Sequence, residues 1–334
     1  MRAMLFHQSA PIEQSPLAWS ELPDPSPGPG QVRLAVRCCA VCRTDLHLIE
    51  GDIHPPALPI VPGHQIVGVV DALGPACQRL QPGMRVGVAW LRHVCGSCRF
   101  CAAGRENLCP ASQYTGFHAN GGFAQYALAP EDFTYELPAS YDDVSVAPLL
   151  CAGIIGYRAL KRCNLPPGGR LGIFGFGSSA HIVLQLAIHR GHQVYVVSRG
   201  ENHQRLARQM GAAWCGADAS QIPAPLESAI VFAPSGAVVP AALAALDSGG
   251  TVALAGIHMT PIPSLDYDRY LYRERDIHGV MANTRADARE LLTEAAAAHV
   301  RPHTLSYPLR DANRALADMK AGRIDGTGVL AVGS

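Results

Sequence analysis

The chain has 334 residues, of which 48% are hydrophobic and 16% are charged. This composition allows sizeable cores, suggests about two domains and excludes a disordered chain. Lys+Arg and Asp+Glu number 27 each, and no basic stripe or tail stands out, so nucleic acid is not expected as a main partner. No apolar run approaches the ~20 residues of a membrane span, and the start has no signal-peptide pattern. We therefore expect a cytoplasmic protein with reduced thiols and no membrane partner.

The first part of the chain reads as β-rich. Segments 32–37 and 66–70 alternate or run apolar between turn residues, which is typical of short strands. The run of prolines and glycines at 23–30 predicts an extended connector. We expect residues 1–152 to form the first domain.

Three residues far apart in the sequence have the side chains of metal ligands. This three-ligand set comprises Cys42, His64 and Cys151. A zinc ion with three protein ligands keeps one position for water or substrate, which is the arrangement of catalytic sites. Any one of these residues alone is more often a core residue, so the prediction depends on the joint pattern. Thr44 and Asp45, just after Cys42, also fit the N-cap of a short helix.

Four cysteines crowd a second segment, the lobe 95–109. Cys95, Cys98, Cys101 and Cys109 read C-x2-C-x2-C-x7-C in a loop that has no core of its own. Four thiolates around one zinc would supply the missing folding energy, so we expect a structural zinc. Free cysteines and an iron–sulfur cluster are the alternatives. The ferredoxin cluster pattern has a shorter gap before its last cysteine.

The pattern changes near residue 150. Strand-like segment 170–174, a helix over 180–189 and strand-like segment 194–198 follow one another, and further apolar strands follow at 229–232, 251–254 and 277–280. This alternation predicts a doubly wound parallel sheet, a Rossmann α/β domain over 153–285. A helix over 286–298 opens the tail, and we expect residues 286–334 to return to the first domain.

A glycine turn opens the predicted Rossmann domain. Gly175, Gly177, Ser178 and Ala180 lie in a G-x-G-x-x-A segment between a strand and a helix. The first two glycines allow a tight turn and close approach of a pyrophosphate, and the small last residue allows close helix–strand packing. We expect a dinucleotide at this helix N-terminus.

The end of the next strand bears on cofactor choice. An acid there would bind the ribose of NAD, but this chain has Ser198 and Arg199. A guanidinium in place of the acid favours NADP(H) over NAD(H). A solvated loop charge is the alternative interpretation of Arg199.

The chain carries five motifs in a characteristic order. They are Cys42-x-Thr44-Asp45-x-x-His47, Gly63-His64, the four-cysteine lobe, Cys151 and the Gly175 turn. With these motifs the chain resembles the zinc-dependent alcohol dehydrogenases of the medium-chain dehydrogenase/reductase superfamily, over essentially its whole length. The resemblance implies a GroES-like β-rich catalytic domain beside the Rossmann domain. It also implies reversible hydride transfer between an alcohol and a nicotinamide cofactor.

The resemblance implies roles for individual residues. The three-ligand set would hold a catalytic zinc, Thr44 would begin a proton relay, and His47 would end it. Asp45 would orient His64.

The resemblance also implies the lining of the site. Trp90 would line the substrate pocket, or else be plain core, and Ala255 and Ile257 would lie at the nicotinamide. The family usually has Glu where this chain has Gln65, and we hypothesise a more electrophilic zinc here, because one negative charge is missing.

We therefore expect a homodimeric or homotetrameric enzyme with two zinc ions per chain that acts on small, uncharged alcohols or aldehydes. A polyol dehydrogenase or an aldehyde-preferring reductase of the same superfamily is an alternative; polyol relatives usually have Glu as third ligand, which weighs against them. An alternative of a different class is a non-catalytic, nucleotide-binding redox sensor that keeps only the structural zinc. Zinc content distinguishes it from the enzyme.

Overall fold

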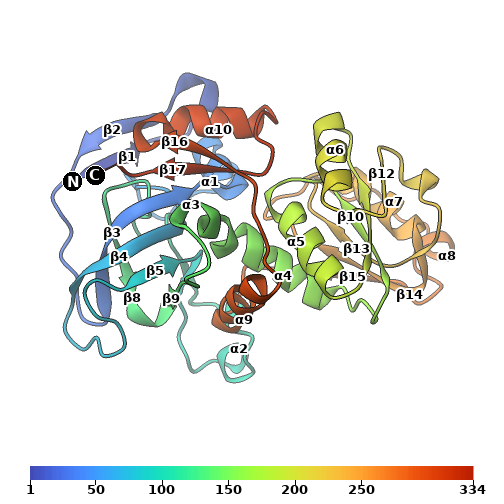
Figure 1. The fold of residues 1–334 in the computed structure, drawn as a ribbon, viewed down its shortest axis with the longest axis horizontal. Coiled ribbons are helices and arrows are strands. Elements are labelled where there is room, and N and C mark those ends of the chain that lie inside the picture. Colours follow the sequence, from blue (N-terminus) through green and yellow to red (C-terminus); the bar gives the residue numbers. More distant parts are fainter. Residues whose placement is uncertain (334) are drawn as a thin grey trace. The chain divides into compact units, whose positions relative to one another are not determined.

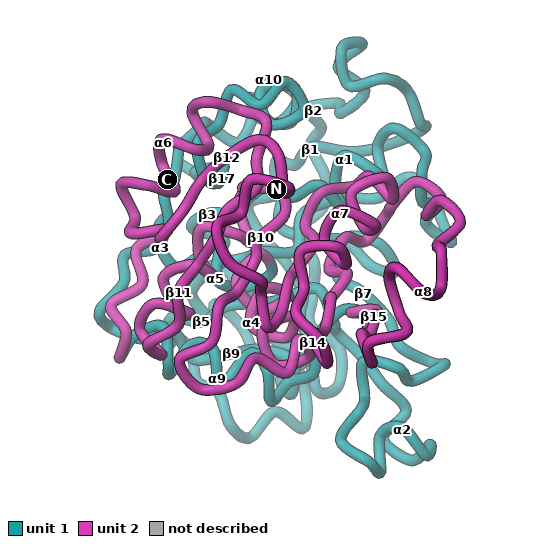
Figure 2. The backbone as a smooth tube through the Cα atoms, turned by 90° about the vertical axis from the view of Figure 1, so that its right-hand side faces the viewer, with its two compact units in different colours: residues 1–151, 282–296, 302–334 teal, residues 152–281, 297–301 magenta. Residues whose placement is uncertain are grey.

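A computed structural model describes residues 1–333, and the chain divides into two compact units (Figure 2). Unit 1 contains residues 1–151, 282–296 and 302 to the end of the described chain, and unit 2 contains residues 152–281 and 297–301. Within the described residues no single helix has the length and apolar character of a membrane span. Two consecutive helical segments, 143–150 and 152–162, reach that length and apolar composition together, but the chain bends between them.

Unit 2 is built on a six-stranded parallel sheet in the order β12-β11-β10-β13-β14-β15. Its strands are β10 (Arg170–Phe174), β11 (Gln193–Val197), β12 (Trp214–Gly216), β13 (Leu226–Val231), β14 (Leu246–Leu254) and β15 (Asp276–Gly279). Numbered from β10, this is the order 3-2-1-4-5-6 of dinucleotide-binding folds. The prediction of a doubly wound Rossmann sheet is confirmed.

The strands of unit 2 are apolar because helices connect and cover them. β10 and β13 are buried almost throughout, as expected for central strands of a parallel sheet. The helices of this unit are α4 (Ala152–Arg162), α5 (Ser178–His189), α6 (Glu201–Gln209), α7 (Val239–Ala244) and α8 (Tyr267–Tyr270). In the amphipathic α6, Leu206 and Ala207 are buried among charged and polar neighbours.

Unit 1 is β-rich, and its main sheet has the order β16-β17-β3-β4-β5-β9, with β8 also paired to β3 (Figure 1). Neighbouring strands are antiparallel except for β16 and β17. The strands of this sheet are β3 (Gln31–Ala40), β4 (Gln65–Leu73), β5 (Arg85–Val88), β8 (Tyr126–Pro130), β9 (Thr134–Glu136), β16 (Thr304–Pro308) and β17 (Thr327–Ala331). The last two come from the tail of the chain, so the sheet joins residues from both ends of the sequence.

Two smaller β-pairs complete unit 1. They are β1 (Arg2–Phe6) with β2 (Leu17–Glu21), and β6 (Leu91–His93) with β7 (Gln113–Tyr114). The helices are α1 (Arg43–Glu50), α2 (Arg99–Ala102), α3 (Asp143–Val146), α9 (Arg285–Ala297) and α10 (Ala312–Lys320). Together with the main sheet these elements support the three-ligand set and the lobe.

Candidate metal and cofactor sites

The structure brings the three-ligand set together. Cys42 is the N-cap of α1, His64 directly precedes β4, and Cys151 follows the short helix 147–150. Cys42 Sγ lies 4.0 Å and His64 Nε2 lies 3.3 Å from Cys151 Sγ. Ligands about 2.3 Å from a tetrahedral zinc are separated by about 3.8 Å, so the three donor atoms fit one ion.

Asp45 connects the two loops that supply Cys42 and His64. Its Oδ2 accepts the Cys42 N–H at 2.8 Å and its Oδ1 accepts the Gly63 N–H at 3.2 Å. Oδ1 is also 3.2 Å from His64 Nδ1, an ion-pair distance at an angle that is not that of a good hydrogen bond. The carboxylate therefore fixes both ligand loops, as a group beneath a metal-bound imidazole commonly does.

The electrostatics of this set favour a cation. Burial lowers the pKa of His64, but Asp45 and Cys42 outweigh burial and raise that pKa to about 10. The hydrogen bond from Cys151 holds the pKa of Cys42 well below its ordinary value despite burial. Thiolate is the form of cysteine that binds metal, so the donor chemistry as well as the spacing fits zinc.

Thr44 and His47 both lie on α1, the helix that Cys42 caps. Thr44 is buried, and its Oγ1 is 3.6 Å from Cys42 Sγ. His47 Nδ1 lies 2.7 Å from Asp52 Oδ2. The sequence interpretation missed Asp52; the glycine at 51, in a left-handed conformation that ends α1, was the signal that the chain folds back there.

Trp90 belongs to an aromatic group next to His64. Its ring stacks on Tyr114 at 4.9 Å, meets His64 edge-on at 4.8 Å, and lies 5.9 Å from Phe117. Trp90 is partly exposed, so it borders the metal position rather than filling the core. Tyr114 and Phe117 were not predicted from the sequence.

Gln65, the residue that differs from the family pattern, is fully buried. Its Nε2 donates to the carbonyl oxygens of Ala40 at 3.2 Å and Val41 at 3.3 Å. An amide can donate in this place, whereas an ionised carboxylate can only accept.

The four cysteines of the lobe also converge. Cys95 Sγ is 4.0 Å from Cys101 Sγ and 3.5 Å from Cys109 Sγ, and Cys98 Sγ is 3.5 Å from Cys101 Sγ. All four thiols are free. Backbone N–H groups of Ser97 and Cys98 lower the pKa of Cys95 to about 6, so a thiolate is ready to bind metal. The spacing matches a closed four-thiolate zinc.

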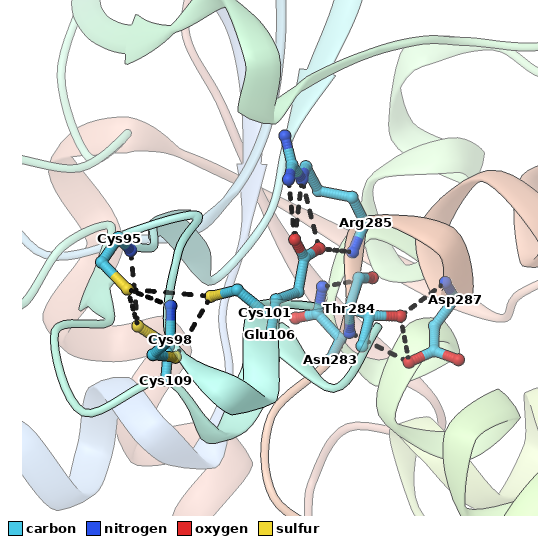
Figure 3. A network of polar contacts seen from close by, with 9 residues as sticks. All are labelled: Cys95, Cys98, Cys101, Glu106, Cys109, Asn283, Thr284, Arg285 and Asp287. Atoms are coloured by element: carbon cyan, nitrogen blue, oxygen red, sulfur yellow. Dashed lines mark hydrogen bonds and ion pairs between the residues drawn. The ribbon is translucent and has the colours of Figure 1, made fainter. Parts of the chain in front are cut away.

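A salt bridge joins the lobe to the start of α9 (Figure 3). Glu106, between the third and fourth cysteines, receives the Arg285 backbone N–H at 2.7 Å, and its Oε2 pairs with Arg285 Nη2 at 2.7 Å. The Arg285 guanidinium also lies over the Phe133 ring at 4.7 Å. Thr284 and Asp287 close the same turn, with the Thr284 N–H donated to Asp287 Oδ2 at 2.9 Å. The lobe is thus fastened to a helix that lies far along the sequence.

In unit 2, the glycine turn follows β10 as predicted. Gly175 has φ +91°, and a Cβ there would lie 2.9 Å from the backbone nitrogen of Ala233, so only glycine fits. Gly177 is the N-cap of α5, Ser178 is its first residue, and Ala180 is fully buried. The N-terminus of α5 therefore presents backbone N–H groups where a pyrophosphate would bind.

The other predicted cofactor residues also follow strand ends. Ser198 comes directly after β11, is buried, and accepts Gln204 Nε2 at 2.6 Å through its carbonyl. Arg199 is exposed and makes no hydrogen bond or ion pair with any residue from 1 to 333. After β14, Ala255 is buried and Ile257 is half exposed. Ligands of such folds bind beyond the carboxyl ends of the strands, where these residues lie.

A Rossmann unit, a β-rich unit and two clusters of residues that could hold a metal ion are the features of a two-unit, zinc-binding dehydrogenase. The family model "Alcohol dehydrogenase GroES-like domain" matches residues 28–139, and the model "Zinc-binding dehydrogenase" matches residues 180–297. The "Probable alcohol dehydrogenase AdhA" of Mycobacterium tuberculosis is 48% identical, covering 99% of this chain and 97% of that protein.

Solved structures agree with this assignment. A cobalt- and zinc-bound thermostable alcohol dehydrogenase from Pyrobaculum aerophilum has a TM-score of 0.90 at 25% identity and covers 99% of both chains. Acetophenone reductase from Geotrichum candidum, in complex with NAD, has a TM-score of 0.89 at 26% identity, covering 99% of this chain and 97% of that chain. The chain belongs to the zinc-type alcohol dehydrogenases of the medium-chain dehydrogenase/reductase superfamily.

Proposed function

We propose that the protein is zinc-dependent and catalyses reversible hydride transfer between a small, uncharged alcohol and its aldehyde, with NADP(H) as the preferred cofactor. The observation that carries this proposal is the convergence of Cys42, His64 and Cys151 within 4.8 Å, with Thr44 beside them. A three-ligand set suits catalysis, whereas the four-thiolate lobe is closed, so we propose two zinc ions per chain with different tasks.

In this proposal each protein group has one task. Zinc held by the three-ligand set supplies Lewis-acid chemistry that makes an alcohol hydroxyl acidic near neutral pH. Thr44 Oγ1 accepts the hydroxyl proton and passes its own proton on, because a hydroxyl both donates and accepts. His47, oriented by Asp52, delivers the proton to solvent. A nicotinamide cofactor bound in unit 2 would supply the hydride acceptor.

The expected substrate class follows from the walls of the site. Trp90 presents an aromatic surface to His64, Tyr114 and Phe117 pack against Trp90, and none of the three is an acidic or basic side chain. Such walls favour compact apolar alcohols and aldehydes over charged substrates.

The NADP(H) preference is supported by Arg199. Its guanidinium follows β11 and has no acidic partner within residues 1–333. A free guanidinium at this strand end can bind a ribose 2′-phosphate, whereas an acidic residue in the same place would repel that phosphate.

The primary test is a panel of alcohols and aldehydes with both cofactors, followed at the nicotinamide absorbance. We expect turnover with uncharged substrates and its loss in Cys151→Ser. Cys163→Ser is the matched control, since Cys163 is buried in unit 2 and belongs to neither cluster. Equal turnover in wild type and Cys151→Ser would contradict the proposed zinc chemistry.

The cofactor proposal has its own test. We expect Arg199→Asp to raise the KM for NADPH by about tenfold or more and to improve use of NADH, because the new carboxylate favours a free ribose hydroxyl. Arg208→Asp, an exposed change on α6, is the control. Tighter binding of NADH than NADPH by the wild type would overturn the preference.

The assembly and location are also proposals. We propose a homodimer or homotetramer in the cytoplasm, where the thiols of the lobe stay reduced. Light scattering of the zinc-loaded protein tests the assembly, and a monomer at micromolar concentration would contradict it.

A further inference from the structure

A cavity in unit 1 is lined by none of the residues proposed to bind zinc or move the proton, although Phe117 borders both it and the aromatic group around Trp90. Its volume is about 390 Å³, and its walls come from the loop before β4, from β6, from the loop at 117–120 and from β8. Apolar side chains, among them Pro59, Ile60 and Phe117, form much of the wall. Neither the three-ligand set nor the lobe cysteines line it.

Arg92 on β6 lines this cavity and is only 8% exposed. It makes no hydrogen bond or ion pair with the residues that the structure describes, and its Nε is enclosed without an acceptor. A guanidinium stays protonated in proteins, so this is a buried charge without a counterion. Burial lowers the pKa of Arg92, and no neighbouring acid opposes this effect. Such a charge is unfavourable unless a ligand pairs with it.

Two amide side chains of the cavity, those of Gln31 and Asn120, can donate to a ligand. Gln31 Oε1 is already occupied by the Gly28 N–H at 3.1 Å, and Asn120 Oδ1 by the Val61 N–H at 2.9 Å. The NH2 group of each amide can donate to a ligand.

His118 adds a further donor. Its Nδ1 accepts the Tyr114 N–H at 3.1 Å, which leaves the ring proton on Nε2. Burial and the nearby Arg92 lower the pKa of His118, so this imidazole is neutral at pH 7.

Acidic side chains are missing from the wall. None of the residues that line the cavity is Asp or Glu. The Met1 ammonium, also at the wall, is taken up by Asp24 Oδ1 at 2.7 Å and by the Leu22 carbonyl. The cavity is therefore rich in donors and has a net positive charge.

We propose that this cavity binds a small organic carboxylate, with the carboxylate on Arg92 and the apolar body against Ile60 and Phe117. A carboxylate matches the two-pronged geometry of a guanidinium. The volume of the cavity exceeds that of an inorganic ion, and such an ion has no apolar surface that could contact the apolar wall.

The test is calorimetric titration of the zinc-loaded protein with hexanoate, hexanamide and inorganic phosphate. We expect saturable binding of hexanoate, with hexanamide and phosphate each weaker by about tenfold or more, because one lacks the charge and the other the apolar body. Cys151→Ser should bind hexanoate as the wild type does, which separates this cavity from the proposed catalytic zinc. Loss of binding in Cys151→Ser, or equal binding of phosphate, would overturn the proposal.

Variants of the cavity complete the test. Arg92→Met should weaken hexanoate binding by about tenfold or more and should raise the melting temperature of the ligand-free protein, because an unpaired buried charge is removed. Ala57→Trp should block binding by filling the cavity without changing any charge. If Arg92 were structural, Arg92→Met would lower the melting temperature and leave hexanoate affinity unchanged, and either result contradicts the proposal.

Discussion

Gln65 shows how one side chain is matched to its surroundings. Its amide donates to two carbonyl oxygens at the end of β3 and just beyond it, while the residue before it supplies the imidazole of the three-ligand set. The sequence suggested a missing negative charge near the metal. The structure adds that the backbone here needs a donor, which Glu cannot be when ionised.

We therefore predict that Gln65→Glu lowers the free energy of unfolding by about 1–3 kcal/mol, since the carbonyls of Ala40 and Val41 lose the amide donor of Gln65 and face a carboxylate. Thermal and urea denaturation measure the change. Gln221→Glu, at an exposed position, should change it little. An unaltered stability of Gln65→Glu would show that the carbonyls find other donors. An unchanged pH–rate profile would count against the charge hypothesis.

Thr44 allows a second residue-scale prediction. If its hydroxyl accepts the substrate proton, Thr44→Ala should lower kcat by about 10²-fold or more, and Thr44→Ser should keep most of the activity. Steady-state kinetics at constant zinc content measures both variants. A Thr44→Ala enzyme with wild-type kcat would remove Thr44 from the proton path.

The sequence identifies ligand types better than it identifies their supports. Cys42, His64 and Cys151 could be named because zinc restricts the side chains that bind it. Arg92 could not be assigned a place, since a guanidinium is ordinarily exposed and its burial depends on loops distant in sequence. Asp52 stays exposed, and its pairing with His47 depends on the turn of the chain at Gly51. The sequence already gives the type of each residue, and the three-dimensional structure adds which residue it contacts.

At the scale of elements, the lobe depends on a contact that no local pattern predicts. The lobe's own apolar cluster is small, with Leu91, Val94 and Phe133 around Cys109. The Glu106–Arg285 pair fastens it to the first residue of α9, and Figure 3 shows both oxygens of Glu106 engaged. This pair should contribute to stability because both partners are largely shielded from water.

We predict that Glu106→Gln destabilises the protein by about 1–3 kcal/mol at pH 7. Burial raises the pKa of Glu106, but the hydrogen bonds and charge of Arg285 outweigh it and lower that pKa overall. A lowered pKa in the folded state contributes stability above the unfolded value of about 4.3, and this contribution is lost as the pH falls through the folded value. The difference between wild type and Glu106→Gln should therefore shrink at acid pH.

Urea denaturation at several pH values measures this dependence. Glu136→Gln is the matched control, because that exposed carboxylate meets Arg79 only at 3.8 Å and should matter little. A destabilisation of Glu106→Gln that stays constant down to pH 3 would mean that the loss comes from packing and not from the ion pair.

The alternation of strands and helices was predictable in unit 2 because buried parallel strands are short apolar runs separated by amphipathic helices. The spatial order of these strands was not, since β10 lies between β11 and β13 for reasons of crossover geometry rather than local sequence. In unit 1 the two-residue β7 has no hydrophobic period long enough to detect.

At the scale of the whole molecule, one chain builds two units with different demands on metal. The clusters proposed to hold zinc both lie in unit 1, whereas the glycine turn lies in unit 2. Metal content therefore reports on unit 1, and nucleotide binding reports on unit 2. The two measurements can be made separately on the full chain.

We predict two zinc ions per chain by elemental analysis, with separable effects of their loss. Cys151→Ser should hold one zinc and lose turnover while the lobe stays folded. Cys98→Ser should also hold one zinc, but it should melt at lower temperature and be cleaved by protease within 95–109, since the zinc supplies the folding energy of that loop. Both variants should still bind NADPH, because the α5 N-terminus is unaltered. One zinc in the wild type, with none lost in Cys151→Ser, would favour the non-catalytic alternative.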